Sequence, residues 1–350
     1  MSGIGRLAQT VVLLAATAAS AHSADARAGV DAPTVDAAPF LGDHYPTRHT
    51  GFPRGVTGIS DVTYETLPGF RPLTLDIYSP AGHDRLRPLV LYIHGGGWTT
   101  GHSRQSGAFD DFPRVLAMLA ARGYVVASLN YRLSGEAPFP AAIQDVKAAI
   151  KFMRAHAEEY VLDESKGIVW GGSAGGHLAA LAALTCGVQA LEPPLPPEPS
   201  AAALQVAGQS DCVQGAVTWY GVFDLSMLPS LNGATEPSPT IRRFLGCTDT
   251  ACSLQTLEAA SPIHYTDTAA SPPPFLLVHG AADKTVNPMQ STRFQEVFER
   301  AGGHAELLMI PSVDHSFIGP TIEATRAASL LALRRTFDFI DATMKGQPPR

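Results

Sequence analysis

Short apolar stretches recur along the chain and alternate with longer amphipathic ones. The apolar stretches have the length of strands and span residues 88–94, 124–131, 167–172, 215–220, 275–279 and 305–310. The stretches with a helical pattern span 109–122, 140–159, 174–185, 290–302 and 322–344. Continuous apolar runs are typical of strands that are buried on both faces. The alternation therefore predicts a mostly parallel sheet covered by helices on both sides.

The sheet is expected to begin with an antiparallel pair. Residues 62–67 and 73–78 alternate apolar and polar side chains around a Pro-Gly turn, which is typical of strands with one solvated face. With this pair the sheet has about eight strands. Two inserts interrupt the alternation: a proline-rich one at 187–211, and one at 221–272 that mixes short helices with turns. Such inserts usually lie on the surface, where they form lids and pocket walls.

The first residues of the chain have the pattern of an export signal. Arg6 is followed by an apolar stretch over 7–19, which is too short to span a bilayer, and then by small residues. We interpret 1–26 as a signal peptide with its flank; a short buried helix is the alternative. An N-terminal extension over 27–55 and one domain over 56–346 are expected to follow. No later stretch has the length of a membrane span, so we expect a secreted or periplasmic protein.

Composition and charge restrict the partners. Of the 350 residues, 45% are hydrophobic and 16% are charged, a balance typical of a globular protein with a sizeable core. The net charge of −7 comes without a dense basic stretch. Nucleic acids and anionic membrane surfaces would be repelled, so neither is expected as a partner. Small-molecule and polymeric substrates both remain open, and the composition does not indicate an oligomeric state.

The four cysteines allow three complete pairings. Export favours disulfides over free thiols. We predict that Cys186 pairs with Cys212 and that Cys247 pairs with Cys252, because each pair closes a loop in irregular chain. A zinc site is the alternative, but the cysteines lack the paired C-x-x-C spacing of structural zinc sites. We therefore expect no metal.

The strongest candidate for chemistry is the run Gly171-Gly172-Ser173-Ala174-Gly175, which lies directly between an apolar run and a helical pattern. Small residues around a serine allow the sharp, strained turn that lifts a nucleophile above the edge of a sheet. The N-terminus of the following helix would direct its positive end at the reacting oxygen. A capping serine in a glycine-rich turn is the alternative. We predict that Ser173 is a nucleophile.

A second glycine-rich turn, HGGGW at 94–98, follows another apolar run. Attack of a serine on an ester creates an oxyanion, which backbone amides can stabilise if they are already in place. Residues without a Cβ let the backbone approach the substrate closely. We expect the amides of Gly96, Gly97 and Ala174 to form this oxyanion hole; a plain glycine turn is the alternative.

A serine hydroxyl needs a base to take its proton, and the base needs a third group that fixes its tautomer. Asp283 lies in the loop after the apolar run FLLVH, and His315 lies in the loop after AELLMI. We predict that His315 is the base and Asp283 the acid, since the order Ser, Asp, His is the one that α/β-hydrolases use. His94 and His279, at the ends of apolar runs, are expected to have structural roles.

Other residues could take these roles. Asp314 adjoins His315, but neighbouring side chains on an extended loop tend to diverge. His177 lies one helical turn beyond the nucleophile and is expected to pack against the sheet. Asp145, in a helical stretch, is expected to support the nucleophile loop or Tyr131; a solvated helix face is the alternative.

The substrate pocket can be outlined only by position along the chain. Four aromatic residues follow the oxyanion loop, end an apolar run beside the nucleophile or follow the base: Trp98, Trp219, Tyr220 and Phe317. Each could line an apolar site for the acyl or the alcohol group. Aromatic residues at strand ends belong to the core as often as to a pocket, so both interpretations stay open.

Five segments together, HGGGW, ASLNYRLSGEAPFPAAIQDVKAAI, VWGGSAGGHLAAL, HGAADKTVNPMQS and VDHSF, resemble the bacterial feruloyl-esterase-like branch of the α/β-hydrolases, near the hormone-sensitive-lipase-like esterases. The resemblance covers about 56–344. It implies carboxylesterase activity without a cofactor, in some members on acetylated or feruloylated plant polysaccharides. The proline-rich insert at 187–211 departs from the commoner pattern.

The sequence therefore predicts a secreted serine carboxylesterase with an α/β-hydrolase fold. It is expected to cleave short-chain or aromatic esters, free or linked to a polysaccharide. An amidase or peptidase with the same triad is one alternative, because the motifs do not encode the leaving group. A non-catalytic binding protein on the same fold is another, although such proteins usually lack a member of the triad.

Overall fold

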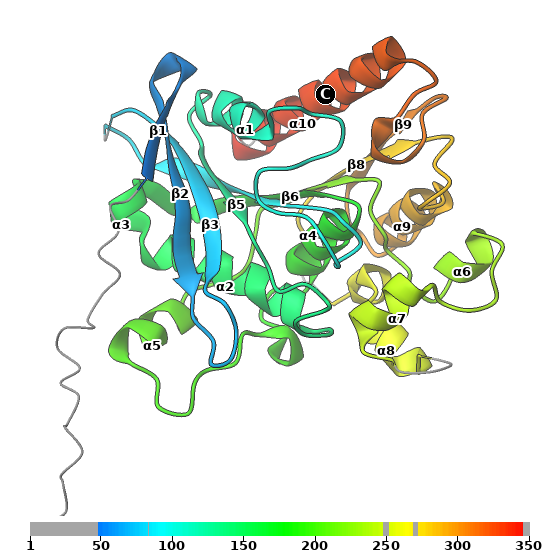
Figure 1. Cartoon of the computed structure of the whole chain (residues 1–350), viewed down its shortest axis with the longest axis horizontal. Helices are drawn as coiled ribbons and strands as arrows, with labels where there is room; N and C mark the ends of the chain where they lie inside the picture. Colours follow the sequence, from blue (N-terminus) through cyan, green and yellow to red (C-terminus); the bar gives the residue numbers. More distant parts are fainter. Residues whose placement is uncertain (1–47, 83, 248–251, 269–271, 346–350) are drawn as a thin grey trace, which may run out of the picture. The chain divides into compact units, whose positions relative to one another are not determined.

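The computed structural model describes residues 48–82, 84–247, 252–268 and 272–345. They form a nine-stranded sheet in the order β1-β2-β3-β5-β4-β6-β7-β8-β9, with helices on both faces (Figure 1). The strands are β1 (Arg48–Phe52), β2 (Val56–Glu65), β3 (Leu73–Pro80), β4 (Arg87–Ile93), β5 (Val125–Leu129), β6 (Leu162–Gly172), β7 (Gly215–Trp219), β8 (Phe275–Gly280) and β9 (Ala305–Ile310). Strands β1, β2, β3 and β5 pair antiparallel, and the remaining pairs are parallel.

The longer helices follow the sequence pattern closely. They are α1 (Phe112–Ala120), α2 (Ala141–Ala155), α4 (Ala174–Leu184), α9 (Met289–Arg300) and α10 (Ile322–Met344). The shorter ones are α3 (Ala157–Tyr160), α5 (Ala201–Ala207), α6 (Leu228–Leu231), α7 (Pro239–Leu245) and α8 (Leu254–Ala259). None of the helices in the described ranges is both long and apolar enough to cross a membrane.

The strand count differs from the expected eight because of β1. This strand lies at the sheet edge and pairs only with β2, through backbone hydrogen bonds. Four of its five side chains are exposed, so it has no apolar face that the sequence pattern could reveal. The sheet therefore begins at Arg48, inside the segment interpreted as an N-terminal extension. The proposed signal peptide, 1–26, lies outside the described residues.

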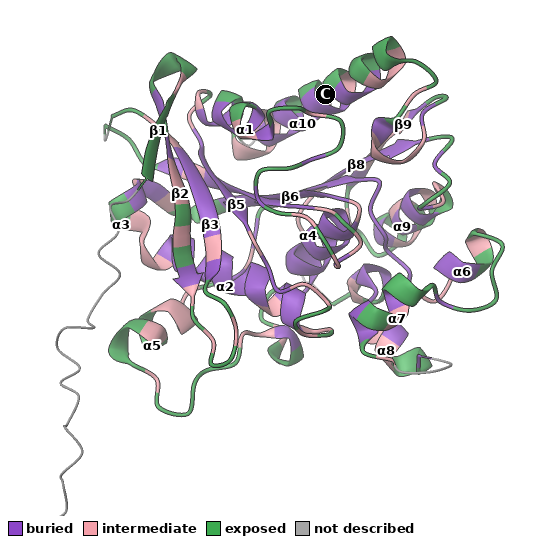
Figure 2. Cartoon of the chain, viewed as in Figure 1, coloured by how far each residue is buried: buried purple, intermediate pink, exposed green. Residues whose placement is uncertain are grey.

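The two faces of the sheet carry two separate hydrophobic cores. On one face, α1 and α10 pack over side chains such as Tyr92 and Trp170. On the other face, α2, α4 and α9 cover the sheet, and α4 is buried along its whole length. The strands of the sheet centre are buried on both sides, as Figure 2 shows. This arrangement is what the continuous apolar runs predict.

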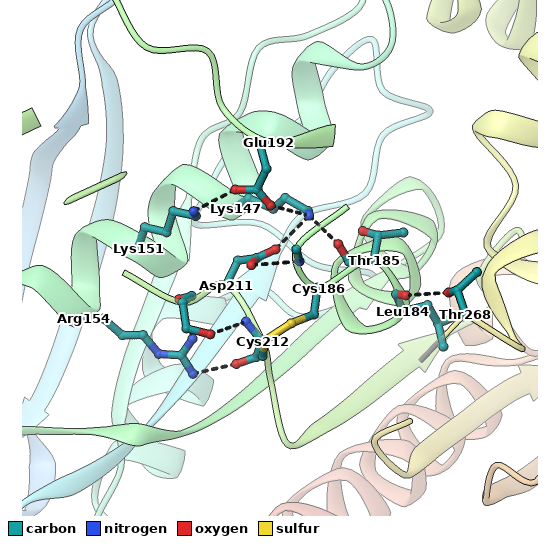
Figure 3. Close-up of a disulfide and its surroundings, with 12 residues drawn as sticks. Lys147, Lys151, Arg154, Leu184, Thr185, Cys186, Glu192, Asp211, Cys212 and Thr268 are labelled. Carbon is teal, nitrogen blue, oxygen red and sulfur yellow. Dashed lines mark hydrogen bonds and ion pairs between the residues drawn. A yellow bond between two sulfur atoms is a disulfide. The ribbon is translucent and has the colours of Figure 1, made fainter. Parts of the chain in front are cut away.

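The proline-rich insert is fastened to α2. Disulfide bonds join Cys186 to Cys212, across this insert, and Cys247 to Cys252. Lys147 of α2 is fully buried beside the first bond, where its ammonium group lies 2.7 Å from Asp211 (Figure 3). Further along α2, Arg154 donates a hydrogen bond of 2.7 Å to the carbonyl of Cys212. One face of α2 therefore holds the proline-rich insert in place.

One carboxyl group makes the fold sensitive to pH. Burial and the nearby charge of Asp145 raise the pKa of Glu65 to about 7. Because the unfolded chain titrates near the ordinary value of about 4.3, the native state loses stability as the pH rises from there through about 7. We expect Glu65→Gln to be more stable than wild type at pH 8, by at most about 4 kcal/mol, and to match it near pH 4. Urea unfolding at the two pH values measures this; an equal difference at both would contradict it.

Candidate active site

Ser173 lies on a sharp turn between β6 and α4. Its backbone has φ 55° and ψ −122°, a conformation that costs energy for a residue with a side chain. Glycines make the turn possible: a Cβ at Gly175 would lie 2.0 Å from the carbonyl oxygen of Ile93, and one at Gly171 would lie 2.3 Å from that of Gly175. The G-x-S-x-G spacing is thus a steric requirement of this turn.

Three of the predicted residues meet at the carboxyl edge of the sheet. The Nε2 atom of His315 lies 3.0 Å from the Oγ atom of Ser173. On the other side of the ring, Nδ1 lies 2.8 Å from Oδ2 of Asp283. The Asp283 side chain is completely buried, whereas that of His315 is 19% exposed. The contacts form a continuous path from hydroxyl to imidazole to carboxylate. In this geometry the imidazole can act as a general base, and the carboxylate can stabilise its protonated form.

The surroundings of Asp283 keep its carboxyl group ionised. Burial raises its pKa, but hydrogen bonds from His279 and His315 outweigh burial, and the net pKa lies well below the usual range. Its Oδ1 atom accepts hydrogen bonds of 2.8 and 2.9 Å from the amides of Thr285 and Val286. The imidazole of His279 lies 3.3 Å from Oδ2. A carboxylate held in this way can orient the His315 ring and stabilise its protonated form.

His279 therefore supports the carboxylate of Asp283, a contact that sequence reasoning missed. Its Nε2 atom lies 2.9 Å from the carbonyl of Val286, and its Nδ1 atom lies 2.7 Å from the hydroxyl of Ser291. The spacing of four residues between His279 and Asp283 is the sequence feature that could have indicated this contact.

The alternative candidates are engaged elsewhere. Asp314 accepts hydrogen bonds of 2.8 and 2.7 Å from the amides of Lys284 and His315, so it caps the loop backbone. His177 is fully buried, with Nε2 2.7 Å from the carbonyl of Ala260. Burial lowers its pKa to about 4. Asp145 is buried against Arg132, which excludes the solvated helix face.

The glycine-rich turn after β4 has amides suited to an oxyanion hole. Gly96 and Gly97 have φ values of 109° and 60°, and a Cβ at Gly96 would lie 2.2 Å from the carbonyl oxygen of Thr100. Within the described ranges, the amides of Gly96 and Gly97 donate to no protein acceptor. Ala174 begins α4, where the amides of the first turn have no partner in the helix.

A cavity of about 740 Å³ opens above Ser173 and His315. One of its walls is the loop after the glycine-rich turn at 94–98, including Gln105, Ser106 and Gly107. A second wall comes from the insert at 221–272 and includes Val222, Leu228, Pro229, Asn232, Glu236, Ser238, Thr240 and Ile241. No residue of the proline-rich insert lines this cavity, so that insert does not shape its rim.

Two of the four aromatic residues suggested for the pocket line it. Trp98 and Tyr220 are in the cavity wall. Trp219 is instead core: its indole nitrogen donates to the hydroxyl of Thr336 at 2.9 Å. Phe317 is also buried, with its ring against Trp219 and Tyr220. Tyr220 follows the strand with φ 40°, so strand alternation does not set its direction, and its ring and that of Trp219 both contact Phe317.

The sheet is mostly parallel, the serine turn follows β6, the carboxylate follows β8 and the histidine follows β9. This arrangement is the α/β-hydrolase fold. The BD-FAE family model matches residues 75–298. The chain therefore belongs to the BD-FAE family.

Several known proteins resemble the chain. Esterase LipQ of Mycobacterium tuberculosis is 31% identical over 83% of this chain and 64% of its own length. A truncated carbohydrate esterase from gut microbiota has a TM-score of 0.67 at 25% identity, over 84% of this chain and 99% of that one. Esterase Est2 of Thermogutta terrifontis has a TM-score of 0.63 at 25% identity, over 87% of this chain and 94% of that one. The chain spans 49% to 64% of the length of LipQ, LipM and LipC, three of the curated M. tuberculosis proteins that resemble it.

Proposed function

We propose that this protein is a serine carboxylesterase that works through an acyl-enzyme. The observation that carries the proposal is the continuous contact from Ser173 through His315 to the ionised Asp283, at the floor of a cavity. Membership in the BD-FAE family and the esterase names of LipQ and Est2 support it.

The reaction follows from these positions. His315 takes the proton of the Ser173 hydroxyl as its oxygen attacks the ester carbonyl, and Asp283 stabilises the imidazolium that forms. The amides of Gly96, Gly97 and Ala174 donate hydrogen bonds to the oxyanion. His315 then returns the proton to the leaving alcohol, which departs and leaves the acyl group on Ser173. Water, activated by the same histidine, releases the acid and restores the enzyme. No step requires a cofactor.

A fluorophosphonate probe and a panel of p-nitrophenyl esters test this proposal together. An active esterase should be labelled at Ser173 and should hydrolyse p-nitrophenyl acetate. A protein that is neither labelled nor active would be a non-catalytic binding protein on this fold. Labelling with faster cleavage of anilides than of matching esters would assign it to the amidases.

The composition of the cavity wall supports an expectation about the acyl group. The insert at 221–272 mixes apolar residues such as Leu228 and Ile241 with polar ones such as Asn232 and Thr240. A long acyl tail gains about 0.8 kcal/mol for each methylene only where it meets apolar surface. We therefore expect kcat/KM for p-nitrophenyl acetate and butyrate to exceed that for palmitate, with methyl ferulate accepted through contact with Tyr220. A higher kcat/KM for palmitate than for butyrate would contradict this.

We also propose that the protein is exported, after removal of a signal peptide within 1–26, to the periplasm or the medium. The two disulfide bonds support this location, because they persist in oxidising compartments. Mass spectrometry of the exported protein, without reduction, should find a start within or just after 1–26 and the bonds Cys186–Cys212 and Cys247–Cys252. In the chain-entropy model the longer loop contributes about 3 kcal/mol. Free thiols, or crossed pairs, would refute the pairing.

A further inference from the structure

The glycine-rich turn at 94–98, which is proposed to form the oxyanion hole and is called the oxyanion turn below, is held at both ends by one neighbouring segment, Tyr131–Ser134. At the first end, the Tyr131 hydroxyl donates to the carbonyl of His94 at 3.1 Å, and the two rings stack with centroids 4.3 Å apart. At the other end, the amide and the hydroxyl of Ser134 both donate to the carbonyl of Trp98, at 2.8 and 2.9 Å. The candidate donor amides lie between these two attachments.

The turn needs such support because its backbone is strained. Gly96, Gly97 and Trp98 are consecutive residues with positive φ, of 109°, 60° and 57°. A tryptophan in this region costs energy that its surroundings must offset. Contacts at the two ends therefore set where the intervening amides point.

A buried ion pair fixes the supporting segment in turn. Arg132 and Asp145 are 6% and 0% exposed. Oδ2 of Asp145 accepts the backbone amide of Arg132 at 2.6 Å, and the guanidinium contacts both carboxylate oxygens at 2.5 to 3.0 Å. Asp145 thus binds the main chain between Tyr131 and Ser134 as well as the side chain. A charged pair that binds at several points defines position and angle more sharply than apolar packing does.

We propose that Asp145 and Arg132 are positioning residues that hold the oxyanion amides of Gly96 and Gly97 in place through Tyr131 and Ser134. The inference rests on the proposed esterase function. Neither residue lines the cavity. Both act through the turn, so their loss affects the transition state more than the binding of the ester.

The chain offers a matched control. Lys147 of α2 and Asp211 of the proline-rich insert form a second buried ion pair, with an N to O distance of 2.7 Å and side chains 0% and 5% exposed. Asp145→Asn removes the carboxylate that pairs with Arg132, and Asp211→Asn removes one of the two carboxylates that pair with Lys147, since Glu192 stays at 3.1 Å. Loss of a carboxylate beside a buried cation typically costs stability. Only the first change touches the support of the oxyanion turn.

The experiment compares these two variants with wild type in two assays at a temperature where each is folded. The first is hydrolysis of p-nitrophenyl butyrate. The second is inhibition by a trifluoromethyl ketone, which adds the serine oxygen and places an oxyanion in the hole.

For Asp145→Asn we expect kcat/KM to fall by about 10- to 100-fold, the scale of a misplaced catalytic group. The inhibition constant should rise by a similar factor, with KM within about threefold of wild type. Asp211→Asn should leave both values near those of wild type.

A purely structural role would give a different result. Partial unfolding lowers kcat in proportion to the folded fraction but leaves the inhibitor affinity of that fraction unchanged. If Asp145→Asn retains the wild-type inhibition constant, or if Asp211→Asn changes it equally, the proposal is wrong.

If Asp145→Asn does not fold, the double variant Tyr131→Phe/Ser134→Ala decides, because it removes a hydroxyl hydrogen bond at each end of the turn and keeps the ion pair. It should raise the inhibition constant by about tenfold or more, and an unchanged constant overturns the proposal. An inactive wild type would instead refute the esterase function.

Discussion

Ser173→Ala is expected to lower kcat by about 10³-fold or more while the protein stays folded. The hydroxyl is the only group that could form the acyl-enzyme at this position, and His315 would have no proton to accept. The residual rate would come from substrate binding and the oxyanion amides, which the substitution leaves in place. Because alanine is smaller than serine and equally compatible with the neighbouring glycines, the turn should keep its conformation.

Steady-state hydrolysis of p-nitrophenyl acetate and the thermal unfolding midpoint measure the two parts of this prediction. Ser165→Ala is a matched control, since Ser165 is an exposed serine on the same strand, β6. The control should keep wild-type activity. Near-normal turnover in Ser173→Ala would remove the nucleophile assignment and with it the proposed mechanism.

Asp283→Asn is expected to lower kcat by roughly 10³- to 10⁴-fold. The asparagine amide can donate to Nδ1 of His315, which would favour the tautomer that has its proton on Nε2 and cannot accept one from Ser173. The charge that stabilises the imidazolium would also be lost. Since the amides of Thr285 and Val286 could still donate to the asparagine oxygen, the loop should remain in place.

Asp314→Asn distinguishes this assignment from its nearest alternative. Among the residues that the structure describes, Asp314 accepts hydrogen bonds from backbone amides alone. An asparagine oxygen can accept them too, so activity should fall by less than about tenfold. Parallel measurements of kcat for the two variants decide between the acids. A large loss in Asp314→Asn with a small one in Asp283→Asn would require Asp314 to be the acid.

The sequence predicts those parts of the fold that depend on burial and spacing. Strands such as β4 and β8 are buried on both faces, so their apolar runs are visible without any knowledge of their neighbours. The serine turn is visible because its steric requirements fall within five consecutive residues. The edge strand β1 is not visible, because backbone pairing with β2 forms it and Phe52 is its one residue that packs against the core.

The pocket was harder to predict because it depends on backbone angles. Tyr220 has φ 40°, and Ser316 and Phe317 have φ 60°, so the chain changes direction at the end of β7 and just after His315. Side-chain directions at such points do not follow the strand pattern. The second cavity wall comes from an irregular insert, whose position in space depends on tertiary contacts rather than on local spacing.

The packing of α7 connects substrate size to the chemical step. The Phe244 ring of α7 stacks on Trp98 with centroids 4.4 Å apart, and a Cβ at Gly97 would lie 3.1 Å from the methyl group of Thr240. An ester too large for the space beneath α7 could enter only by displacing these side chains, and the amides beside them would move as well. Such a molecule would occupy the cavity and react slowly, so it would behave as a competitive inhibitor of smaller esters.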